Sequence, residues 1–183
     1  MTKCKFCKKP ATQKFGLNYF CNSECAYNQA RANIIKRADI DAKERRKRDR
    51  ELLVKLKTRS EWLRDAQVVF NRFIRLRDAG NPCISCGRNS GAKMNAGHYL
   101  SVGAHPELRF NEFNTNLQCE HCNSYKSGNQ AEYRPKLIAK IGLAEVERLE
   151  GPQLPLKLTI PEIQELIKTY KTKCKELLNS SDQ

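Results

Sequence analysis

Apolar residues recur at helical spacing between residues 60 and 80. The positions that share one face of this predicted helix are Trp62, Ala66, Val69, Phe70, Phe73, Ile74 and Leu76. Ser60 can cap the start of the helix, and Gly80 lies just past its end. The apolar face must be buried, and we expect its partner to be the cysteine-rich stretch that follows. Arg72, Arg75 and Arg77 should remain outside, where they could face DNA.

The last part of the chain is also helical. Leu137, Ile138 and Ile141 form an apolar cluster, Gly142 stops a helix, and residues 143–149 form another short one. Residues 151–158 contain two prolines and predict an extended connection. Thr159 and Glu162 then have capping-box spacing for a final helix. Its apolar positions predict packing rather than a binding site: Ile163, Leu166, Ile167, Tyr170, Cys174 and Leu177.

A different pattern fills residues 26–59, which are charged, favour helix and contain no Gly or Pro. We predict a long exposed helix in which acids pair with bases three or four residues away. Its apolar residues are too few for a coiled coil. The helix is either a solvated spacer or a basic arm that lies along the phosphate backbone. The basic residues of this arm are Lys43, Arg45, Arg46, Lys47, Arg48 and Arg50.

Eight of the nine cysteines fall into two groups with the spacing of four-thiolate zinc sites. The first group is Cys4, Cys7, Cys21 and Cys25, and the second is Cys83, Cys86, Cys119 and Cys122. Residues 1–28 are too few to bury a core, so a structural zinc ion would supply the folding energy of a finger with a hairpin over residues 15–20. Two structural Zn²⁺ ions per chain are therefore expected. Cys174 remains alone, and we assign it no role.

Candidate chemistry lies between the two pairs of the second cysteine group. We predict a short strand from Tyr99 to Val102, a turn over residues 103–106, and a return strand over residues 108–110. Asn114 would lie in the following loop, and a helix would run from Cys122 to Ser127. This arrangement leaves His98 free to approach Asn123, with its imidazole exposed at the end of a strand.

The charge balance favours an anionic partner. The 183 residues include 34 Lys and Arg against 20 Asp and Glu, a formal net charge of +14. Such an excess is typical of proteins that neutralise phosphates, although it also suits a ribosomal-type partner or simple solubility. No apolar run approaches the roughly 20 residues that span a bilayer. We therefore expect no membrane association, a cytoplasmic location, and thiols that bind metal rather than form disulfides.

At these residues the chain resembles the HNH endonuclease motif, a β-hairpin and a helix that together hold one catalytic metal ion. In zinc-stapled members a histidine ends the first strand, an asparagine lies five residues before the third cysteine, and His or Asn follows the fourth. The corresponding residues here are His98, Asn114 and Asn123. The resemblance is therefore to the HNN variant, with a ββα-metal core that is also treble-clef-like.

The resemblance implies a role for each of these three residues. His98 would be the general base, Asn114 would orient His98 or its loop, and Asn123 would offer its side-chain oxygen to Mg²⁺ or Mn²⁺. Many members place an aspartate before the histidine as a second metal ligand, but here that residue is Gly97. The candidates to replace it are Asn95, Glu112, Asn129 and Glu132. Lys126 adds a positive charge beside the site.

Flanking stretches at residues 62–64, 74–79, 96–99 and 127–129 are similar to the NinG, or Rap, family of lambdoid phage recombination proteins, over almost the whole chain. This resemblance implies an endonuclease that cuts branched DNA such as Holliday junctions and D-loops in a phage-infected cell. Other recombination proteins and a second copy of the chain are candidate partners.

The expected fold is α+β and predominantly helical, in four parts. These are a zinc finger over residues 1–28, a basic helical arm over 29–59, a nuclease domain over 60–150, and a linker with a final helix over 151–183. Two other functions fit the same residues. One is a non-catalytic zinc-finger protein that binds nucleic acid, and the other is a zinc scaffold for protein partners.

Overall fold

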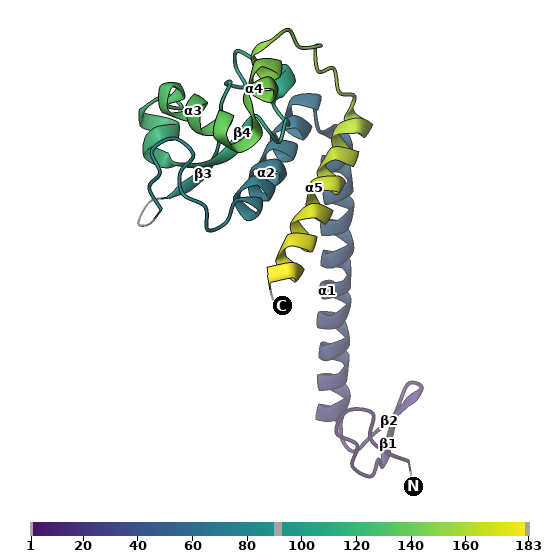
Figure 1. Cartoon of the computed structure of the whole chain (residues 1–183). Helices are drawn as coiled ribbons and strands as arrows, with labels where there is room; N and C mark the ends of the chain where they lie inside the picture. The colour runs from purple at the N-terminus through teal and green to yellow at the C-terminus, as the bar shows by residue number, and fades with distance from the viewer. Residues whose placement is uncertain (1, 90–92, 182–183) are drawn as a thin grey trace. The chain divides into compact units, whose positions relative to one another are not determined.

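The structure, a computed structural model, describes residues 2–89 and 93–181. It is a mostly helical α+β structure that divides into two compact units, Met1–Lys57 and Thr58–Gln183. Figure 1 labels the helices and strands of both units. The α+β class predicted from the sequence is confirmed. Among the described residues, no helix is both long enough and apolar enough to cross a membrane.

The first unit holds a short hairpin and one long helix. Strands β1 (Gln13–Phe15) and β2 (Asn18–Phe20) pair antiparallel, which confirms the hairpin expected over residues 15–20. Helix α1 (Ser23–Leu56) begins after Asn22, whose side-chain oxygen accepts a hydrogen bond from the Cys25 N–H at 2.8 Å. This N-cap satisfies one of the free amides at the helix start. It also fixes Cys25 in the first turn of α1.

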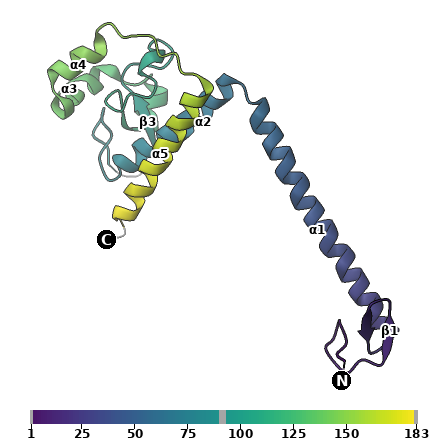
Figure 2. The ribbon, with the colours of Figure 1, turned by 90° about the vertical axis from the view of Figure 1, so that its right-hand side faces the viewer.

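Helix α1 is one continuous rod (Figure 2), and none of its residues is buried. The long exposed helix is therefore confirmed. The ion pairs expected along it are not: within α1, which is described throughout, acids and bases form no ion pair. Solvated charges on a helix surface gain only a few tenths of a kcal/mol by pairing, so their side chains remain extended into solvent.

Helix α2 (Arg59–Arg77) begins two residues earlier than predicted, because its cap is Thr58 rather than Ser60. Thr58 and Glu61 form a capping box, in which the Thr58 hydroxyl accepts from the Glu61 N–H at 3.3 Å and the Glu61 carboxylate accepts from the Thr58 N–H at 2.8 Å. The buried face was predicted correctly, but its main partner was not. Helix α2 packs chiefly along α5 (Ile160–Ser181), with which it shares one hydrophobic core.

The two-stranded sheet of the second unit lies outside the predicted hairpin. Strand β3 (Met94–His98) pairs antiparallel with β4 (Thr115–Cys119), so that His98 ends its strand opposite Thr115. Residues 99–102 form no strand, because the Asn114 side chain takes both backbone groups of Leu100 in place of a neighbouring strand. The predicted return strand at residues 108–110 is also wrong, since Pro106–Leu108 forms the short 3₁₀ helix η1.

Helical elements complete the second unit. The segment η2 (His121–Tyr125) is a single wide turn, shorter than the helix predicted from Cys122 to Ser127, and α3 (Gln130–Ile141) follows after Asn129. Helix α4 (Leu143–Glu150) confirms the short helix expected there. Tyr133 and Leu137 of α3 pack with Val146 and Leu149 of α4 in a second core. The capping box of α5 is confirmed by hydrogen bonds between Thr159 and Glu162.

Candidate metal and catalytic site

The predicted zinc ligands of the second unit converge on one point. The sulfur atoms of Cys83, Cys86, Cys119 and Cys122 all lie within 4.8 Å of one another, and the Cys86 and Cys119 sulfurs are 3.7 Å apart. Tetrahedral zinc with bonds of about 2.3 Å places its sulfurs about 3.8 Å apart. The donor set therefore fits a structural Zn²⁺ ion that joins the loop after α2, the end of β4 and the turn η2.

The four cysteines of the first unit converge in the same way. The sulfur atoms of Cys4, Cys7, Cys21 and Cys25 lie within 4.8 Å of one another, with Cys7 to Cys21 at 3.5 Å and Cys21 to Cys25 at 3.3 Å. Cys4 and Phe20 are the buried residues among the described residues 2–57. Both predicted cysteine groups are thus arranged to hold a metal ion, and thiolates favour zinc among the common divalent ions.

Next to the second cysteine cluster, His98 and Asn123 line one pocket of about 190 Å³. His98 comes from the end of β3, and Asn123 comes from η2, directly after the cluster residue Cys122. Within the described residues, no hydrogen bond engages the Asn123 side chain. The structure therefore brings together two residues that lie far apart in the sequence, and it leaves the Asn123 amide free to bind a ligand.

The environment of His98 determines which ring nitrogen can act as a base. Its Nε2 atom lies 3.0 Å from the backbone oxygen of Arg109. A carbonyl oxygen only accepts hydrogen bonds, so Nε2 carries the hydrogen and Nδ1 is the basic nitrogen of the neutral ring. Burial lowers the pKa of His98, and the positive charge of Arg109 acts in the same direction. The ring is therefore neutral at pH 7.

His98 is less exposed than the sequence suggested. Its side chain is partly buried and lies against Phe70 of α2, with ring centroids 6.4 Å apart. The expectation of a freely exposed imidazole is wrong, because α2 covers this face of the sheet. The contact with Phe70 and the hydrogen bond to Arg109 hold the ring in a defined orientation.

Asn114 lies behind the pocket rather than in it. It is fully buried, its side-chain oxygen accepts from the Leu100 N–H at 2.9 Å, and its amide nitrogen donates to the Leu100 carbonyl at 3.0 Å. Its backbone oxygen also accepts from the Tyr99 N–H at 2.7 Å. Asn114 therefore fixes the loop that follows His98, which makes it a positioning residue that does not touch the pocket.

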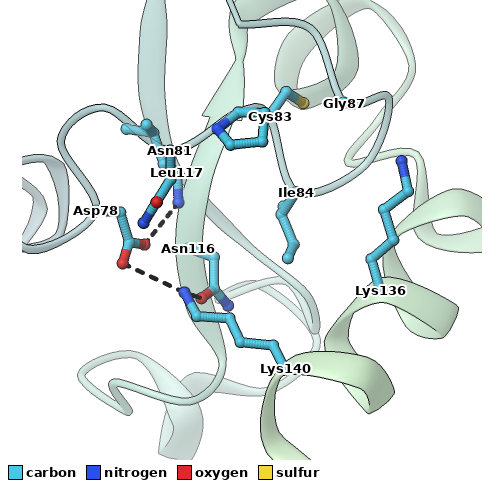
Figure 3. A pocket seen from close by; sticks show the side chains of 10 residues that line it. Asp78, Asn81, Cys83, Ile84, Gly87, Asn116, Leu117, Lys136 and Lys140 are labelled. Atoms are coloured by element: carbon cyan, nitrogen blue, oxygen red, sulfur yellow. Dashed lines mark hydrogen bonds and ion pairs between the residues drawn. The ribbon is translucent and has the colours of Figure 1, made fainter.

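A buried polar network that the sequence did not reveal lies beside β4, near the end of the sheet that carries His98. Asp78, only 3% exposed, accepts hydrogen bonds from the Lys140 ammonium at 3.2 Å and the Leu117 N–H at 3.1 Å. Lys140 also donates to the Asn116 side chain at 2.7 Å. Figure 3 shows these residues together at one side of a separate pocket of about 430 Å³. Their polar groups already satisfy one another, so we assign this pocket a structural role.

The network reaches the backbone next to His98. The Asn116 amide donates to the Tyr133 hydroxyl at 3.1 Å, and that hydroxyl donates to the Gly97 carbonyl at 3.0 Å. Tyr133 is fully buried, and burial raises its pKa well above its ordinary value. The hydroxyl therefore remains protonated and holds the peptide group that precedes His98.

Sequence comparison identifies the family to which this fold and these sites belong. The family profile described as "Bacteriophage Lambda NinG protein" matches residues 1–180. The chain belongs to the NinG family. No solved structure matches it.

Named NinG proteins of several phages are similar to this member of the family. Protein ninG of Escherichia phage lambda is 44% identical over 128 residues, and that of Salmonella phage P22 is 43% identical over 128 residues. Each match covers 70% of this chain and 63% of the relative, so the chain spans less than two thirds of those proteins. Protein ninG of Enterobacteria phage H19B is 35% identical over 204 residues, covering 99% of this chain and 96% of the relative.

In this NinG-family chain, Gly97 is fixed by the side chain that faces it. A Cβ atom at residue 97 would lie 2.1 Å from Oε1 of Gln118 and 2.8 Å from its Cβ, so no aspartate fits there. Gln118 is fully buried, and its amide nitrogen donates to the Gly128 carbonyl at 2.6 Å and to the Ser85 hydroxyl at 2.7 Å. Its Oε1 atom is buried and has no hydrogen-bond partner among the described residues.

None of the four residues expected to replace an acid at position 97 lines the pocket of His98 and Asn123. Two of them have other partners: Glu112 accepts hydrogen bonds from Tyr170 at 3.1 Å and Lys173 at 2.5 Å, and Asn129 donates to the Cys122 sulfur at 3.5 Å. Glu132 is exposed on α3, and Asn95 is half-buried on β3. Gln118 was missed because nothing in the sequence signals its contact with Gly97.

The predicted basic contacts divide into exposed and internal residues. The six basic residues of the arm in α1 are exposed, as are Arg75 and Lys126. Arg77 is different, because its guanidinium points into the protein and donates to Asp78, to the Glu112 and Thr115 carbonyls, and to Asn116. The expectation that Arg77 remains outside is therefore wrong, because its positive charge compensates the buried carboxylate of Asp78.

Proposed function

We propose that this NinG-family protein is a metal-dependent DNA endonuclease of the HNH/HNN class. The observation that supports this most directly is the shared pocket of His98 and Asn123 beside a four-cysteine cluster. A basic nitrogen and a free amide oxygen in one pocket are suited to hydrolysing a phosphodiester. The net charge of +14 favours a nucleic-acid substrate. The ββα-metal arrangement is part of the proposal.

His98 would act on the attacking water. Its neutral ring accepts the proton at Nδ1, while the Arg109 carbonyl keeps the hydrogen on Nε2 and stabilises the imidazolium that forms. Asn114 and Tyr133 would keep the histidine in place through the backbone on either side of it. A positioned general base typically contributes about 10² to 10⁴ in rate.

The oxygen atoms near the pocket suit a divalent cation such as Mg²⁺ or Mn²⁺. Asn123 lines the pocket, and no hydrogen bond among the described residues engages its side chain. Its amide oxygen is a neutral ligand of the kind that Mg²⁺ and Mn²⁺ accept, usually together with water and phosphate oxygens. The bound ion would supply Lewis-acid stabilisation of the charge on the phosphate.

The direct test is a nuclease assay of the zinc-loaded protein on a four-way junction, a flap and a linear duplex, with and without Mg²⁺ or Mn²⁺. The similarity to NinG recombination proteins makes branched DNA the preferred substrate in our proposal. Faster cleavage of the junction than of the duplex, dependent on the divalent ion, is the expected result. Absence of cleavage on all three substrates with either ion would exclude the enzyme.

Substituting Asn123 should weaken the binding of the divalent ion. We expect Asn123→Ala to raise the Mn²⁺ concentration needed for half-maximal cleavage, with partial rescue by excess ion, because one ligand is removed while the base remains. Binding of Mn²⁺ to the zinc-loaded protein, followed by electron paramagnetic resonance, should weaken in parallel. Asn123→Asp is the matched control, since its carboxylate retains the oxygen. Unchanged Mn²⁺ binding in Asn123→Ala would remove Asn123 from the ligand set.

The basic arm in α1 should make DNA binding strongly dependent on salt. If the protein neutralises about 6 to 10 phosphates, affinity should fall by about 10³ to 10⁵ between 50 and 200 mM salt. Charge reversal of Arg45, Arg46 and Arg48 should weaken binding to all DNA shapes alike, as measured by fluorescence anisotropy. Normal binding by that triple variant would show that α1 is a spacer.

A second function, a non-catalytic zinc-finger protein that binds nucleic acid, is favoured by the N-terminal cysteine cluster and its basic surroundings. In that case His98 and Asn123 would be structural residues, and DNA would be bound but not cut. A scaffold for protein partners would instead show little DNA binding and little dependence on salt. The assays above therefore separate the three functions.

A further inference from the structure

A groove of about 340 Å³ runs between α2 and α5 in the second unit. It is lined by Val69 and Arg72 of α2 and by Lys171, Cys174, Lys175 and Leu178 of α5. The two helices lie side by side in both views (Figures 1 and 2). The groove is separate from the pocket of His98 and Asn123, with which it shares no lining residue.

Among the residues that the structure describes, the positive charges at this groove have no acidic partner. Arg72, Lys171 and Lys175 are exposed, and no hydrogen bond or ion pair in the described part of the chain engages their side chains. Several other cations of the same unit are paired with acids. Examples are Lys93 with Glu120, Lys140 with Asp78, Lys173 with Glu112, and Arg134 with Glu150.

Cys174 is the buried member of the groove lining. Burial raises the pKa of its thiol, whereas the charges of Arg72 and Arg75 act to lower it. Arg75 is exposed on α2 and does not line the groove. Like charges in one place repel each other, so an anionic ligand would stabilise the cluster of Arg72, Lys171 and Lys175.

A different face of α5 has mixed charge and provides a comparison. The surface hollow there is lined by Glu165, Lys168, Lys173 and Glu176 among others, and Lys168 lies 3.4 Å from the Glu165 carboxylate. None of the described residues that line the groove between α2 and α5 is acidic. The single sign of charge is thus specific to the groove and does not follow from α5 as a whole.

We propose that the groove between α2 and α5 binds the phosphodiester backbone of a nucleic-acid strand. Lys171 and Lys175 lie one turn apart on α5, about 6 Å along the axis, and Arg72 faces them from α2. Ammonium and guanidinium groups are the usual partners of backbone phosphates. Leu178, 41% exposed, and Val69 offer apolar surface to the sugars.

This inference rests on the proposed nucleic-acid role of the protein, but not on catalysis or on α1. It adds a sequence-independent interaction on the unit that carries His98 and Asn123. Interactions with the backbone fix the position and register of a strand on a protein. The groove would therefore help to hold the DNA against this unit.

The test compares the Lys171→Glu/Lys175→Glu variant of the full zinc-loaded chain with the parent protein. Binding of a labelled duplex and a labelled four-way junction is measured by fluorescence anisotropy between 50 and 200 mM salt, without added Mg²⁺ or Mn²⁺ so that no cleavage occurs. We expect affinity to fall roughly tenfold or more on both shapes. The salt slope should decrease by about 0.9 for each phosphate that the variant no longer neutralises.

Lys157→Glu is the control for charge alone, because Lys157 is exposed in the connection before α5 and does not line the groove. The single variants Lys171→Glu and Lys175→Glu make the same change in net charge as this control. Each of them should bind DNA more weakly than Lys157→Glu does, and thermal unfolding should be unchanged in all three.

Equal affinity and equal salt slope in the double variant and in Lys157→Glu would overturn the groove proposal while the proposed DNA binding stands. A groove that served an acidic peptide would give that result. Absence of DNA binding by the parent protein would overturn both proposals. If the double variant binds DNA more weakly but cleaves it at the parental rate when DNA is saturating, the result would support DNA binding by the groove independently of the catalytic assignment.

Discussion

Replacing His98 with alanine is expected to lower the rate of DNA cleavage by about 10² to 10⁴ while DNA affinity is retained. The variant removes the basic Nδ1 atom but no surface cation. Because the ring packs against Phe70, we also expect stability to fall by about 0.5 to 3 kcal/mol. Single-turnover cleavage of a junction, anisotropy and thermal unfolding measure the three effects separately.

His105 provides the matched control for this variant. It lies outside the pocket, with Nδ1 3.2 Å from the Glu107 carboxylate, so His105→Ala should cleave at the parental rate. Full activity in His98→Ala would remove the HNN assignment and leave a zinc-finger binding protein as the better account. An equal decrease in rate in both variants would point to general destabilisation instead.

The lowered pKa of His98 sets the expected pH dependence of this reaction. A base must be neutral, and burial favours the neutral ring, so cleavage should persist below the ordinary histidine pKa of 6.5. The rate should then fall as the pH decreases through the lowered value, when the ring becomes protonated. A limb that instead rises as the pH falls would contradict a histidine base.

The sequence was sufficient where structure depends on local spacing. Cysteine pairs separated by two or three residues form compact loops, so both clusters could be placed from their spacing alone. The apolar faces of α2 and α5 and the capping box at Thr159 were equally visible, because helical periodicity is a short-range signal. These elements account for most of the helical part of the second unit.

The hairpin predicted over residues 99–110 was wrong because pairing with β4 outweighed the strand preferences of the individual residues. Residues 94–98 contain Gly, Ala and Asn, which are depleted in strands, whereas residues 99–102 contain Tyr and Val, which are enriched. The ladder nevertheless forms over Met94–His98, where β4 is available, and ends where the Asn114 side chain occupies the backbone of Leu100. A single buried amide thus decided the end of the strand that carries His98.

Side-chain interactions between distant parts of the chain could not be predicted from the sequence. The Arg77 side chain points into the protein because it contacts the buried Asp78 carboxylate. An acid cannot replace Gly97 because Gln118 of the neighbouring strand occupies the space. The spacing of the cysteine pairs left His98 free to approach Asn123, but only the resemblance predicted that the two residues share a site. Side-chain packing between distant elements, rather than any property of single residues, determines these features.

Replacing Cys119 with serine is expected to destabilise the second unit by most of its folding free energy. Cys119 is fully buried at the end of β4, and its sulfur joins two other chain segments, the loop after α2 and the turn η2, through the proposed zinc ion. Zinc binding in small metal-dependent domains is worth about 10 to 16 kcal/mol, comparable to the entire stability of a typical domain, about 5 to 15 kcal/mol. Cys83→Ser should have the same effect.

Elemental analysis and urea unfolding test this expectation together. The parent protein purified under reducing conditions should contain two zinc ions per chain, and Cys119→Ser should contain one. Cys4→Ser should also contain one zinc ion but should unfold only the finger at the start of the chain, leaving the transition of the second unit in place. Cys174→Ser controls for removal of a buried thiol, because Cys174 lies in the core of α2 and α5 away from both clusters, and it should retain both ions. One zinc ion or none in the parent protein would contradict the assignment of two four-thiolate zinc sites.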